Sequence, residues 1–555
     1  MKRQFARSIV GIVVVLALNG LSSLYYYRLD LTEDKRYTLS QAAVSTVDDF
    51  DAPVIIDVLL DGPLPSEFTR LRSETVLLLE QFRSKNSKIQ VNLINPLEEP
   101  QEREQTIFDL QQLGLKPATV TIEDEGRTTQ ELIFPWAMVN HKNKTVKVPL
   151  LKNTLGASQE ERINNSVQNL EYAFSDAFVK LQLQEKKKIA VLKGNGELED
   201  RYLADFLSTI REYYNIGAIT LDQVAEQPNK VLEQLNNFDM ALVAKPTEAF
   251  TEAEKYVLDQ YILYGGKSLW LLDQVAIELD SLFNEKGAAV AIPRDLNLND
   301  FFFKHGIRIN PVLLNDLYNT PIVLATGEAS TAEYNPLPWV YYPMVFSKEN
   351  HPVNTNIEAI QIRFGNVIDT LASLNKKTVV LQSSPFSKKE GTPKSIGLEM
   401  LQTFPSQRDY EPGGGFPIAV AIEGDFTSVY TNRIKPILLK NAKEKGVANK
   451  MIVVADGDII KNQLTNGRPL ELGYDKWTSS FYGNKEFLIN CTNYLLDDLG
   501  LLQLRTKQVA IALLDPQKIV AQKRTWQWLG IGLPLLLIGL LGVIVLLLRK
   551  HYYGA

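Results

Sequence analysis

The sequence is almost free of cysteine. Cys491 is the only one in 555 residues, so an intrachain disulfide, a cysteine-rich zinc site and CxxC redox chemistry are excluded. The G-x-S-x-G motif of a nucleophile elbow is also absent, and Cys491 lies in FLINCTNYLLDD, which we expect to form a buried helix. The histidines between the two ends are His141, His305 and His351. Nucleophilic catalysis is therefore disfavoured, and stability must come from burial.

The sequence also lacks an excess of positive charge. It carries 59 basic and 65 acidic residues, and five of the basic residues lie at the two ends, which leaves an acidic middle. This balance is unlike that of a nucleic-acid binder. Charged residues make up 22% of the chain and hydrophobic residues 45%, which is ordinary for a globular protein and argues against extended disorder.

The first of two long uncharged runs covers residues 8–27 and follows a short basic segment. Twenty residues can just cross a hydrocarbon core of ~30 Å as a helix. A cleaved signal peptide is the alternative, because its basic and apolar regions look alike. No A-x-A cleavage site is present, and the aromatic group at residues 25–27 suits a membrane interface, so we favour an uncleaved anchor.

The second run, residues 525–548, predicts a transmembrane helix with Trp526 and Trp528 at one edge and basic residues at the other. Pro534 lies inside it, where a kink is tolerated in a membrane. Its glycines can allow close helix packing, and these are Gly532, Gly539 and Gly542. The basic flanks predict that both termini are cytoplasmic and that the bulk of the chain lies on the other side of the membrane, held there by two spans.

A mixed-charge segment leaves the first run and ends in a helix-start signal. Ser40 is placed as the N-cap of the next helix, with Leu39 and Val44 as a hydrophobic staple. Residues 54–150 then alternate strand and helix in the order βαβαββ, which predicts a thioredoxin-like domain without its redox cysteines. Such a domain can pack or bind, but it cannot exchange disulfides.

A helix with one apolar stripe follows, over residues 163–181, and we interpret it as core-facing rather than as a docking helix. Seven short apolar runs then alternate with helical segments and predict a largely parallel sheet, of Rossmann or flavodoxin type. They are KIAVLKG, IGAITL, DMALVAKP, KSLWLLD, TVVLQSS, IAVAIEG and MIVVADGD.

The whole chain is therefore divided into eight segments by prediction. These are residues 1–27 (basic segment and first span), 28–50 (juxtamembrane segment and first helix), 51–157 (thioredoxin-like domain), 158–187 (connecting helix), 188–505 (larger α/β domain with insertions), 506–524 (connector), 525–548 (second span) and 549–555 (cytoplasmic tail).

The first candidate ligand loop is Asn195-Gly196-Glu197, because it follows the first strand of the larger domain in the position of a phosphate loop. It has no GxGxxG, so a tight turn is favoured over dinucleotide binding. The stretch Gly265-Gly266-Lys267-Ser268 resembles the end of a Walker A motif. Tyr261 replaces the first glycine of that motif and the order is helix then strand, so the match fails.

Two further groups are candidates for ligand or partner binding. Asp456 and Asp458 end a predicted strand, with Asp475 downstream, and paired carboxylates at a strand end can hold Mg²⁺ or Ca²⁺ but also cap helices and turns. Asp273 ends another predicted strand and is a candidate by its loop position alone. Trp339 and Tyr341 lie in PWVYYP and can stack a sugar or a peptide, although core packing is the more frequent role. We assign no metal, no cofactor and no catalytic residue.

Long, ordered motifs carry a resemblance over the whole chain. They are DLTEDKRYTLS, INNSVQNLEYAF, GNGELED, HGIRINP, PWVYYP, SSPFS, EGDFTSVYTNR, ADGDIIKNQ, LGYD and YGNKEFLINCTNYLLDD. In these motifs the sequence resembles the GldG family of gliding-motility-associated ABC transporter accessory, or substrate-binding, proteins of Bacteroidota. That family has no motif-defined site residues to carry over to this chain.

The resemblance implies an inner-membrane subunit that works with an ABC permease subunit and a cytoplasmic ATPase subunit, in a system associated with gliding motility and type 9 secretion. It also implies that the larger domain is amidotransferase-like but lacks the catalytic residues. We therefore expect a non-enzymatic subunit that couples the transporter to periplasmic machinery. The alternative is a receptor that binds a sugar, peptide or lipid solute, and a residual enzyme is a third reading.

Overall fold

The computed structural model describes residues 38–124, 127–152, 158–182, 185–326, 333–348, 350–355, 357–403, 405–410, 413–497 and 516–553. It is a mixed α/β structure that divides into two compact units, residues 1–508 and 509–555. The first predicted membrane span lies outside the described residues.

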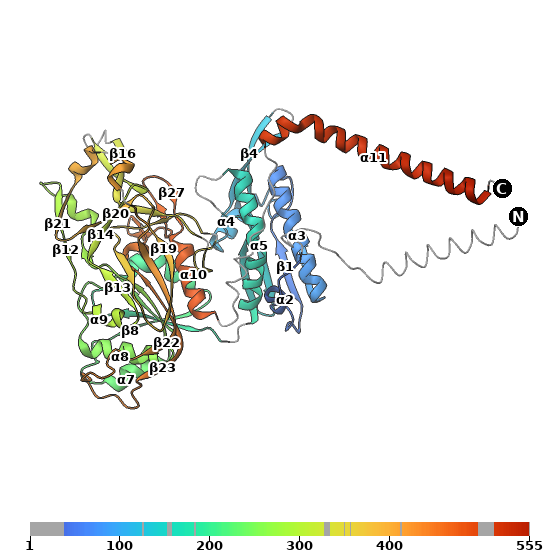
Figure 1. The fold of residues 1–555 in the computed structure, drawn as a ribbon. Coiled ribbons are helices and arrows are strands. Elements are labelled where there is room, and N and C mark those ends of the chain that lie inside the picture. Colours follow the sequence, from blue (N-terminus) through green and yellow to red (C-terminus); the bar gives the residue numbers. More distant parts are fainter. Residues whose placement is uncertain are drawn as a thin grey trace. The chain divides into compact units, whose positions relative to one another are not determined.

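A four-stranded sheet organises the amino-terminal region, with the strand order β2-β1-β5-β6. Figure 1 labels its strand β1. Its strands are β1 (Val54–Val58), β2 (Ile89–Leu93), β5 (Trp136–His141) and β6 (Lys144–Pro149). β1 runs parallel to β2 and antiparallel to β5. Val54, Ile56 and Val58 alternate onto one face and are fully buried beneath α3 (Ser66–Lys85) and α5 (Gln159–Gln182).

The apolar run ELIFPWAMV (residues 131–139), which by its pattern predicts a single strand, is divided in two. β4 (Arg127–Ile133) ends before Phe134-Pro135 and pairs with β3 (Ala118–Asp124) in a separate hairpin, whereas β5 joins the four-stranded sheet. Proline has no amide hydrogen to donate to a ladder, which accounts for the break. α4 (Arg103–Gln112) precedes this hairpin and buries none of its side chains fully.

The predicted N-cap at Ser40 is confirmed. α2 (Gln41–Ser45) begins after it, and Ser40 Oγ accepts a hydrogen bond from Ala43 N at 3.1 Å. Replacement of Ser40 by alanine leaves that amide without its cap, so we expect Ser40→Ala to lower the free energy of unfolding by about 1 kcal/mol. Chemical denaturation checks this value. Ser45→Ala is the control, since Ser45 is exposed and caps nothing; an equal loss in both variants would contradict the capping role.

All seven apolar runs predicted after residue 187 form strands, and all belong to one sheet of the order β19-β22-β23-β10-β9-β7-β8. The strands are β7 (Lys188–Lys193), β8 (Asn215–Thr220), β9 (Met240–Ala244), β10 (Lys267–Leu271), β19 (Lys376–Gln382), β22 (Pro417–Thr427) and β23 (Lys445–Val454). The five from β8 to β23 are parallel, and β22 and β19 continue the sheet antiparallel.

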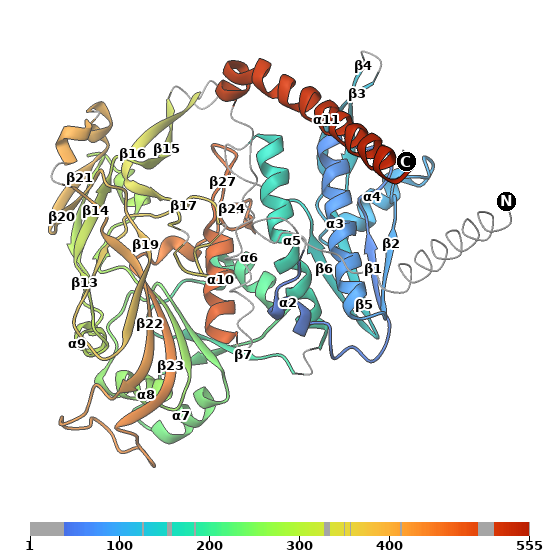
Figure 2. The same ribbon diagram turned by 45° about the vertical axis from the view of Figure 1, so that its right-hand side comes forward.

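Helices cover both faces of this sheet (Figure 2). Alternate side chains of the parallel strands pack with α6 (Asp200–Arg211) and α10 (Asn484–Leu496) on one face. The others pack with α7 (Pro228–Asn236) and α8 (Glu252–Leu263). Burial on both faces explains why these strands are nearly continuous apolar runs.

A β-rich insertion separates β10 from β22, and short elements follow β23. The strands are β11 (Val275–Ala276), β12 (Ala288–Pro293), β13 (Ile307–Asn310), β14 (Val312–Asp316), β15 (Asn319–Thr326), β16 (Glu333–Val345), β17 (Ile360–Gln361), β18 (Val367–Thr370), β20 (Ser387–Gly391), β21 (Lys394–Gly397), β24 (Leu464–Thr465), β25 (Arg468–Pro469), β26 (Tyr474–Asp475) and β27 (Ser480–Phe481). The helices are α9 (Asn299–Lys304) and the 3₁₀ turns η1 (Leu279–Leu282), η2 (Leu398–Gln402), η3 (Gln407–Tyr410) and η4 (Asp458–Ile460).

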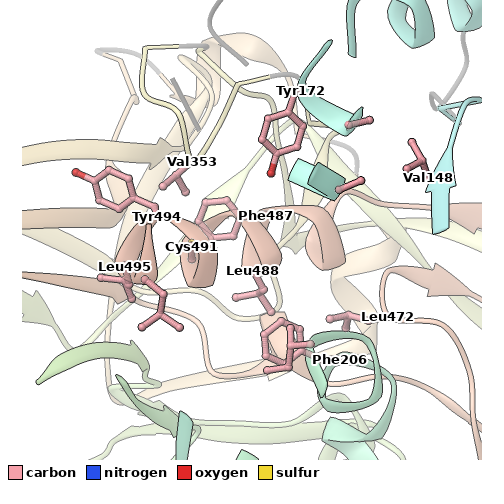
Figure 3. Close-up of a cluster of buried hydrophobic side chains, with 14 of the residues drawn as sticks. Val148, Tyr172, Phe206, Val353, Leu472, Phe487, Leu488, Cys491, Tyr494 and Leu495 are labelled. Atoms are coloured by element: carbon pink, nitrogen blue, oxygen red, sulfur yellow. The ribbon is translucent and has the colours of Figure 1, made fainter. Parts of the chain in front are cut away.

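One hydrophobic core joins the amino-terminal region to the seven-stranded sheet. The predicted stripe of α5 faces this core, with Phe174 and Phe178 fully buried. Figure 3 shows where α10 meets it: Phe487 and Cys491 gather with Tyr172 of α5 and Phe206 of α6. Tyr172 and Phe487 are 315 positions apart in the sequence, so this core fixes long-range packing.

The second compact unit contains one long helix, α11 (Pro516–Tyr553). Residues Gln522–His551 are long and apolar enough to cross a membrane, and the most apolar stretch of 18 residues has a mean hydropathy of 3.0, with none of it buried. The predicted second span lies inside this segment, and Pro534 lies within the helix. A Cβ added at any of Gly532, Gly539 and Gly542 would meet no atom within 4 Å, so close packing against another helix stays a prediction for them.

Asp259 on α8 is a buried carboxyl that forms no ion pair with a lysine or arginine in the described part of the chain. Its oxygens accept hydrogen bonds from Ser428 Oγ at 2.6 Å and Val429 N at 2.8 Å, and burial raises the pKa of Asp259 to about 6. The unfolded chain releases this proton near pH 4, so stability from this group is present below pH 4 and is lost as the pH rises through 6.

The expected size of that loss is about 3 kcal/mol between pH 4 and pH 7, from a pKa difference of roughly two units. Asp259→Asn should remove it, because an amide does not titrate in this range. Chemical denaturation of wild type and Asp259→Asn at pH 4 and at pH 7 gives the difference between their free energies of unfolding at each pH. This difference should change by about 3 kcal/mol between the two pH values. A difference that does not change with pH would show that Asp259 does not titrate as described.

Candidate functional site

Charged side chains gather at the carboxyl ends of three neighbouring strands of the large sheet. Lys245 follows β9, Asp273 comes two residues after β10, and Asp456 and Asp458 come two and four residues after β23. Because β9, β10 and β23 are parallel neighbours, their carboxyl ends meet at one edge, where α/β proteins place functional loops. We call these four residues, with Glu278 and Lys461, the Lys245 cluster.

Lys245 is the centre of the cluster, and its side chain is only 3% exposed. Its Nζ lies 2.6 Å from Asp458 Oδ2 and 3.5 Å from Asp273 Oδ2, and it also pairs with Glu278. Lys461 lies 3.5 Å from both Glu278 and Asp458 and closes the cluster toward solvent. A buried cation is thus surrounded by carboxylates, as a charge in a protein interior requires.

Backbone amides hold the three aspartates in place. Gly457 N donates to Asp273 Oδ1 at 2.6 Å, Asp458 N donates to Asp456 Oδ1 at 2.8 Å, and Arg363 N donates to Asp456 Oδ2 at 3.0 Å. A Cβ at Gly457 would lie 2.5 Å from Lys245 Cγ, so only glycine allows this approach. The turn Asp456-Gly457-Asp458 is therefore shaped around the lysine.

The electrostatics of the three aspartates differ. Burial raises the pKa of Asp273 to about 6, with Lys245 acting against it. Burial and the neighbouring Asp273 and Asp458 raise the pKa of Asp456 well above its usual range. Burial also acts to raise the pKa of Asp458, but the nearby Lys245 and Lys461 outweigh it and hold this pKa below the usual value. The cluster at neutral pH thus pairs an ionised Asp458 with Lys245.

A small cavity adjoins the cluster. A cavity of about 10 Å³ is lined by side chains that include Arg363, Asp458 and Lys461, and this is room for about one water molecule. No group of three or more His, Cys, Asp or Glu side chains in the described part of the chain is arranged to hold a metal ion. The cluster therefore acts as an internal clamp on three loops rather than as an open pocket.

The loop Asn195-Gly196-Glu197 forms a tight turn beside the loop after β9. Gly196 has a φ of +72°, and Asn195 O accepts hydrogen bonds from Thr247 N and Glu248 N, both at 2.9 Å. Burial raises the pKa of Glu197, whose Oε2 accepts from Asn195 N at 2.9 Å. The loop that begins with Lys245 thus touches both groups of predicted residues, which places them along one edge of the sheet.

The aromatic candidates lie elsewhere, on β16. Trp339 is 1% exposed and Tyr341 is fully buried, and Tyr341 Oη donates to Glu390 Oε2 at 2.6 Å. Both rings belong to the core of the β-rich insertion and offer no face to solvent. Their packing explains the cluster of aromatic residues in PWVYYP.

The remaining titratable side chains considered in the sequence are also inside. Cys491 is fully buried, and burial raises the pKa of its thiol. Burial lowers the pKa of His305 to about 3 and that of His351 to about 4, so both rings are neutral at physiological pH. His141 lies against Phe50, and its Nδ1 is 3.2 Å from Pro53 O.

Sequence comparison places the chain among transport proteins. Residues 186–491, more than half of the chain, match a family described as "ABC-type uncharacterized transport system", and residues 33–140 match a domain of unknown function, DUF7088. No curated protein matches the sequence. Among solved structures, a chain described as "mmIFT52 N-terminal domain" is similar, with 15% identity over 56% of this chain and 98% of that one, but its TM-score of 0.31 is too low to establish a shared fold. This protein belongs to the family of the ABC-type uncharacterized transport system.

Proposed function

We propose that the protein is a non-enzymatic, membrane-anchored subunit that couples the permease and ATPase of an ABC transporter to periplasmic machinery. The observation that carries the proposal is the family match over residues 186–491, which contain the seven-stranded sheet. The apolar segment Gln522–His551 supports an anchor, and the resemblance to the GldG family supports a role in gliding motility and type 9 secretion.

The finer architecture is part of the same proposal. The four-stranded sheet with helix α3 supports a thioredoxin-like domain over residues 51–157. Residues 158–187, which contain α5, would join it to a Rossmann-like, amidotransferase-like domain over residues 188–505. Two membrane spans would leave both termini in the cytoplasm and the bulk of the chain in the periplasm. Lys245 fills the space between the aspartates of the Lys245 cluster, which favours a structural role over solute binding for these residues.

Affinity purification of the intact chain from detergent-solubilised membranes tests the proposal. We expect a permease and an ATPase subunit to co-purify, and protease added to spheroplasts to digest the central part of the chain. The control is an unrelated membrane protein with the same tag. Recovery of neither subunit above this control would overturn the proposal, and a rise in melting temperature with a sugar, peptide or lipid would favour the receptor instead.

A further inference from the structure

The loop between β22 and β23 exposes two large aliphatic side chains. Ile434 is 94% exposed and Leu438 is 91% exposed, although both types of side chain are usually buried. Residues 431–445, which we call the basic loop, also carry five lysine or arginine residues against one carboxylate. The loop therefore presents apolar and positive surface together.

The basic loop is fastened to the fold. Arg433 pairs with Asp300 at 2.8 Å and Lys435 pairs with Glu444 at 2.6 Å. Its backbone is held as well, since Lys440 N donates to Asn229 Oδ1 and Tyr264 Oη donates to Asn441 O. The aliphatic side chains are thus held outward, and this is a feature of sites that another molecule covers.

A surface of opposite charge lies on the amino-terminal region. Residues 93–113, which we call the acidic surface, carry five carboxylates against one arginine, and that arginine pairs with Glu131. Their exposed apolar side chains include Phe108 at 54%, Leu113 at 49% and Leu93 at 43%. This surface includes α4, which buries none of its side chains fully.

We propose that the basic loop of one copy of this chain docks on the acidic surface of a second copy. Both surfaces are exposed in the same chain, so neither covers the other within one molecule. Each combines large apolar side chains with an excess of four charges, of opposite sign, and complementary charge sets partner choice and register. Two copies related by a twofold axis make this contact twice.

A second copy satisfies both surfaces at once, whereas an anionic lipid surface satisfies the basic loop alone. Such a lipid surface would repel the carboxylates of residues 93–113 and leave α4 uncovered. The inference concerns self-association and does not depend on the proposed transport function.

Cross-linking in native membranes tests the contact, and the chain suits it because its one cysteine, Cys491, is fully buried. Two full-length variants with different tags, Ile434→Cys and Phe108→Cys, are co-expressed and treated with a short bismaleimide. We expect a product that carries both tags. The control replaces Ile434→Cys with Leu374→Cys, because Leu374 is 98% exposed and belongs to neither surface. An equal yield in the control, or no product, overturns the proposal.

Charge reversal adds a test of the specific pairing. Lys440→Glu with Lys445→Glu on the Ile434→Cys chain should lower the yield roughly tenfold, since like charges then face each other. Glu98→Lys with Glu99→Lys on the Phe108→Cys chain should restore it. All four side chains are exposed, so folding is spared. An unchanged yield after Lys440→Glu with Lys445→Glu overturns the proposal. It is also overturned if the protein binds phosphatidylglycerol vesicles through the basic loop and no cross-link forms between chains.

Discussion

Lys245→Met should lower the free energy of unfolding by about 3–5 kcal/mol, because it removes the cation from a buried ion pair and leaves the carboxylates behind. The Asp458 and Asp273 side chains are 5% and 8% exposed, so water cannot replace the lysine. Methionine keeps most of the apolar stem, so the loss reports the charge rather than a cavity. Denaturation followed by tryptophan fluorescence measures it.

Lys255→Met is a matched control, since Lys255 is equally buried but its partners are not. Its side chain is 2% exposed, whereas Glu252 and Asp300 are 52% and 35% exposed and stay hydrated when the lysine is lost. We expect this variant to lose about 1 kcal/mol. A loss from Lys245→Met no larger than that of the control would mean that the cluster does not clamp the three loops.

The effect should also depend on pH. In the native protein the pKa of Asp458 is lowered, so its stabilising contribution is present above pH 4 and is lost as the pH falls through the folded pKa. In Lys245→Met the pKa of Asp458 should rise, because the cation that favours its ionised form is gone. At any pH above this raised pKa, the ionised Asp458 then destabilises the fold. The difference between wild type and variant should therefore be larger at pH 8 than at pH 5, and a second substitution, Asp458→Asn, should recover part of the loss.

The strands of the large sheet could be predicted because burial on both faces gives each of them a short, nearly continuous apolar run. The helix around Cys491 was predictable for the same reason, as it is buried along most of its length. The separate β3-β4 hairpin was not, since the strand alternation around Phe134-Pro135 does not show which partner each half pairs with.

The candidate site was predicted only in part. Asp273, Asp456 and Asp458 could be placed at strand ends. Lys245 was missed although it lies near the end of the predicted run DMALVAKP, because a lysine after a strand is usually exposed, whereas this one is buried. Glu278 and Lys461 could not be predicted as members of the cluster, because they lie in loops that are far apart in the sequence and are brought together only by the tertiary fold. Trp339 and Tyr341 were predicted as possible ligand contacts but are buried in a core. The sequence does not separate the two roles, because aromatic-rich runs occur both in cores and on binding surfaces.

Phe487→Ala should cost about 3–5 kcal/mol, because this fully buried ring lies in the core shared by α5, α6 and α10. Figure 3 shows it among Tyr172, Phe206 and Cys491, so its removal leaves a cavity where the amino-terminal region meets the large sheet. A single hydrogen bond made by the same helix, such as that from Tyr214 Oη to Asn493 Oδ1 at 2.9 Å, contributes too little to compensate.

Cys491 provides the readout for this loss. It lies one helical turn after Phe487 on α10, it is fully buried, and its raised pKa keeps the thiol protonated and unreactive. A thiol reagent reaches Cys491 only after α10 opens. Phe487→Ala should therefore increase the labelling rate of Cys491 about a hundredfold or more, because each ~1.4 kcal/mol of lost stability raises the fraction of open molecules about tenfold. Phe303→Ala is the control, as Phe303 is 63% exposed. Equal labelling rates in the two variants would mean that α10 does not depend on the shared core, because a ring that supports the helix cannot be removed without exposing the thiol one turn away.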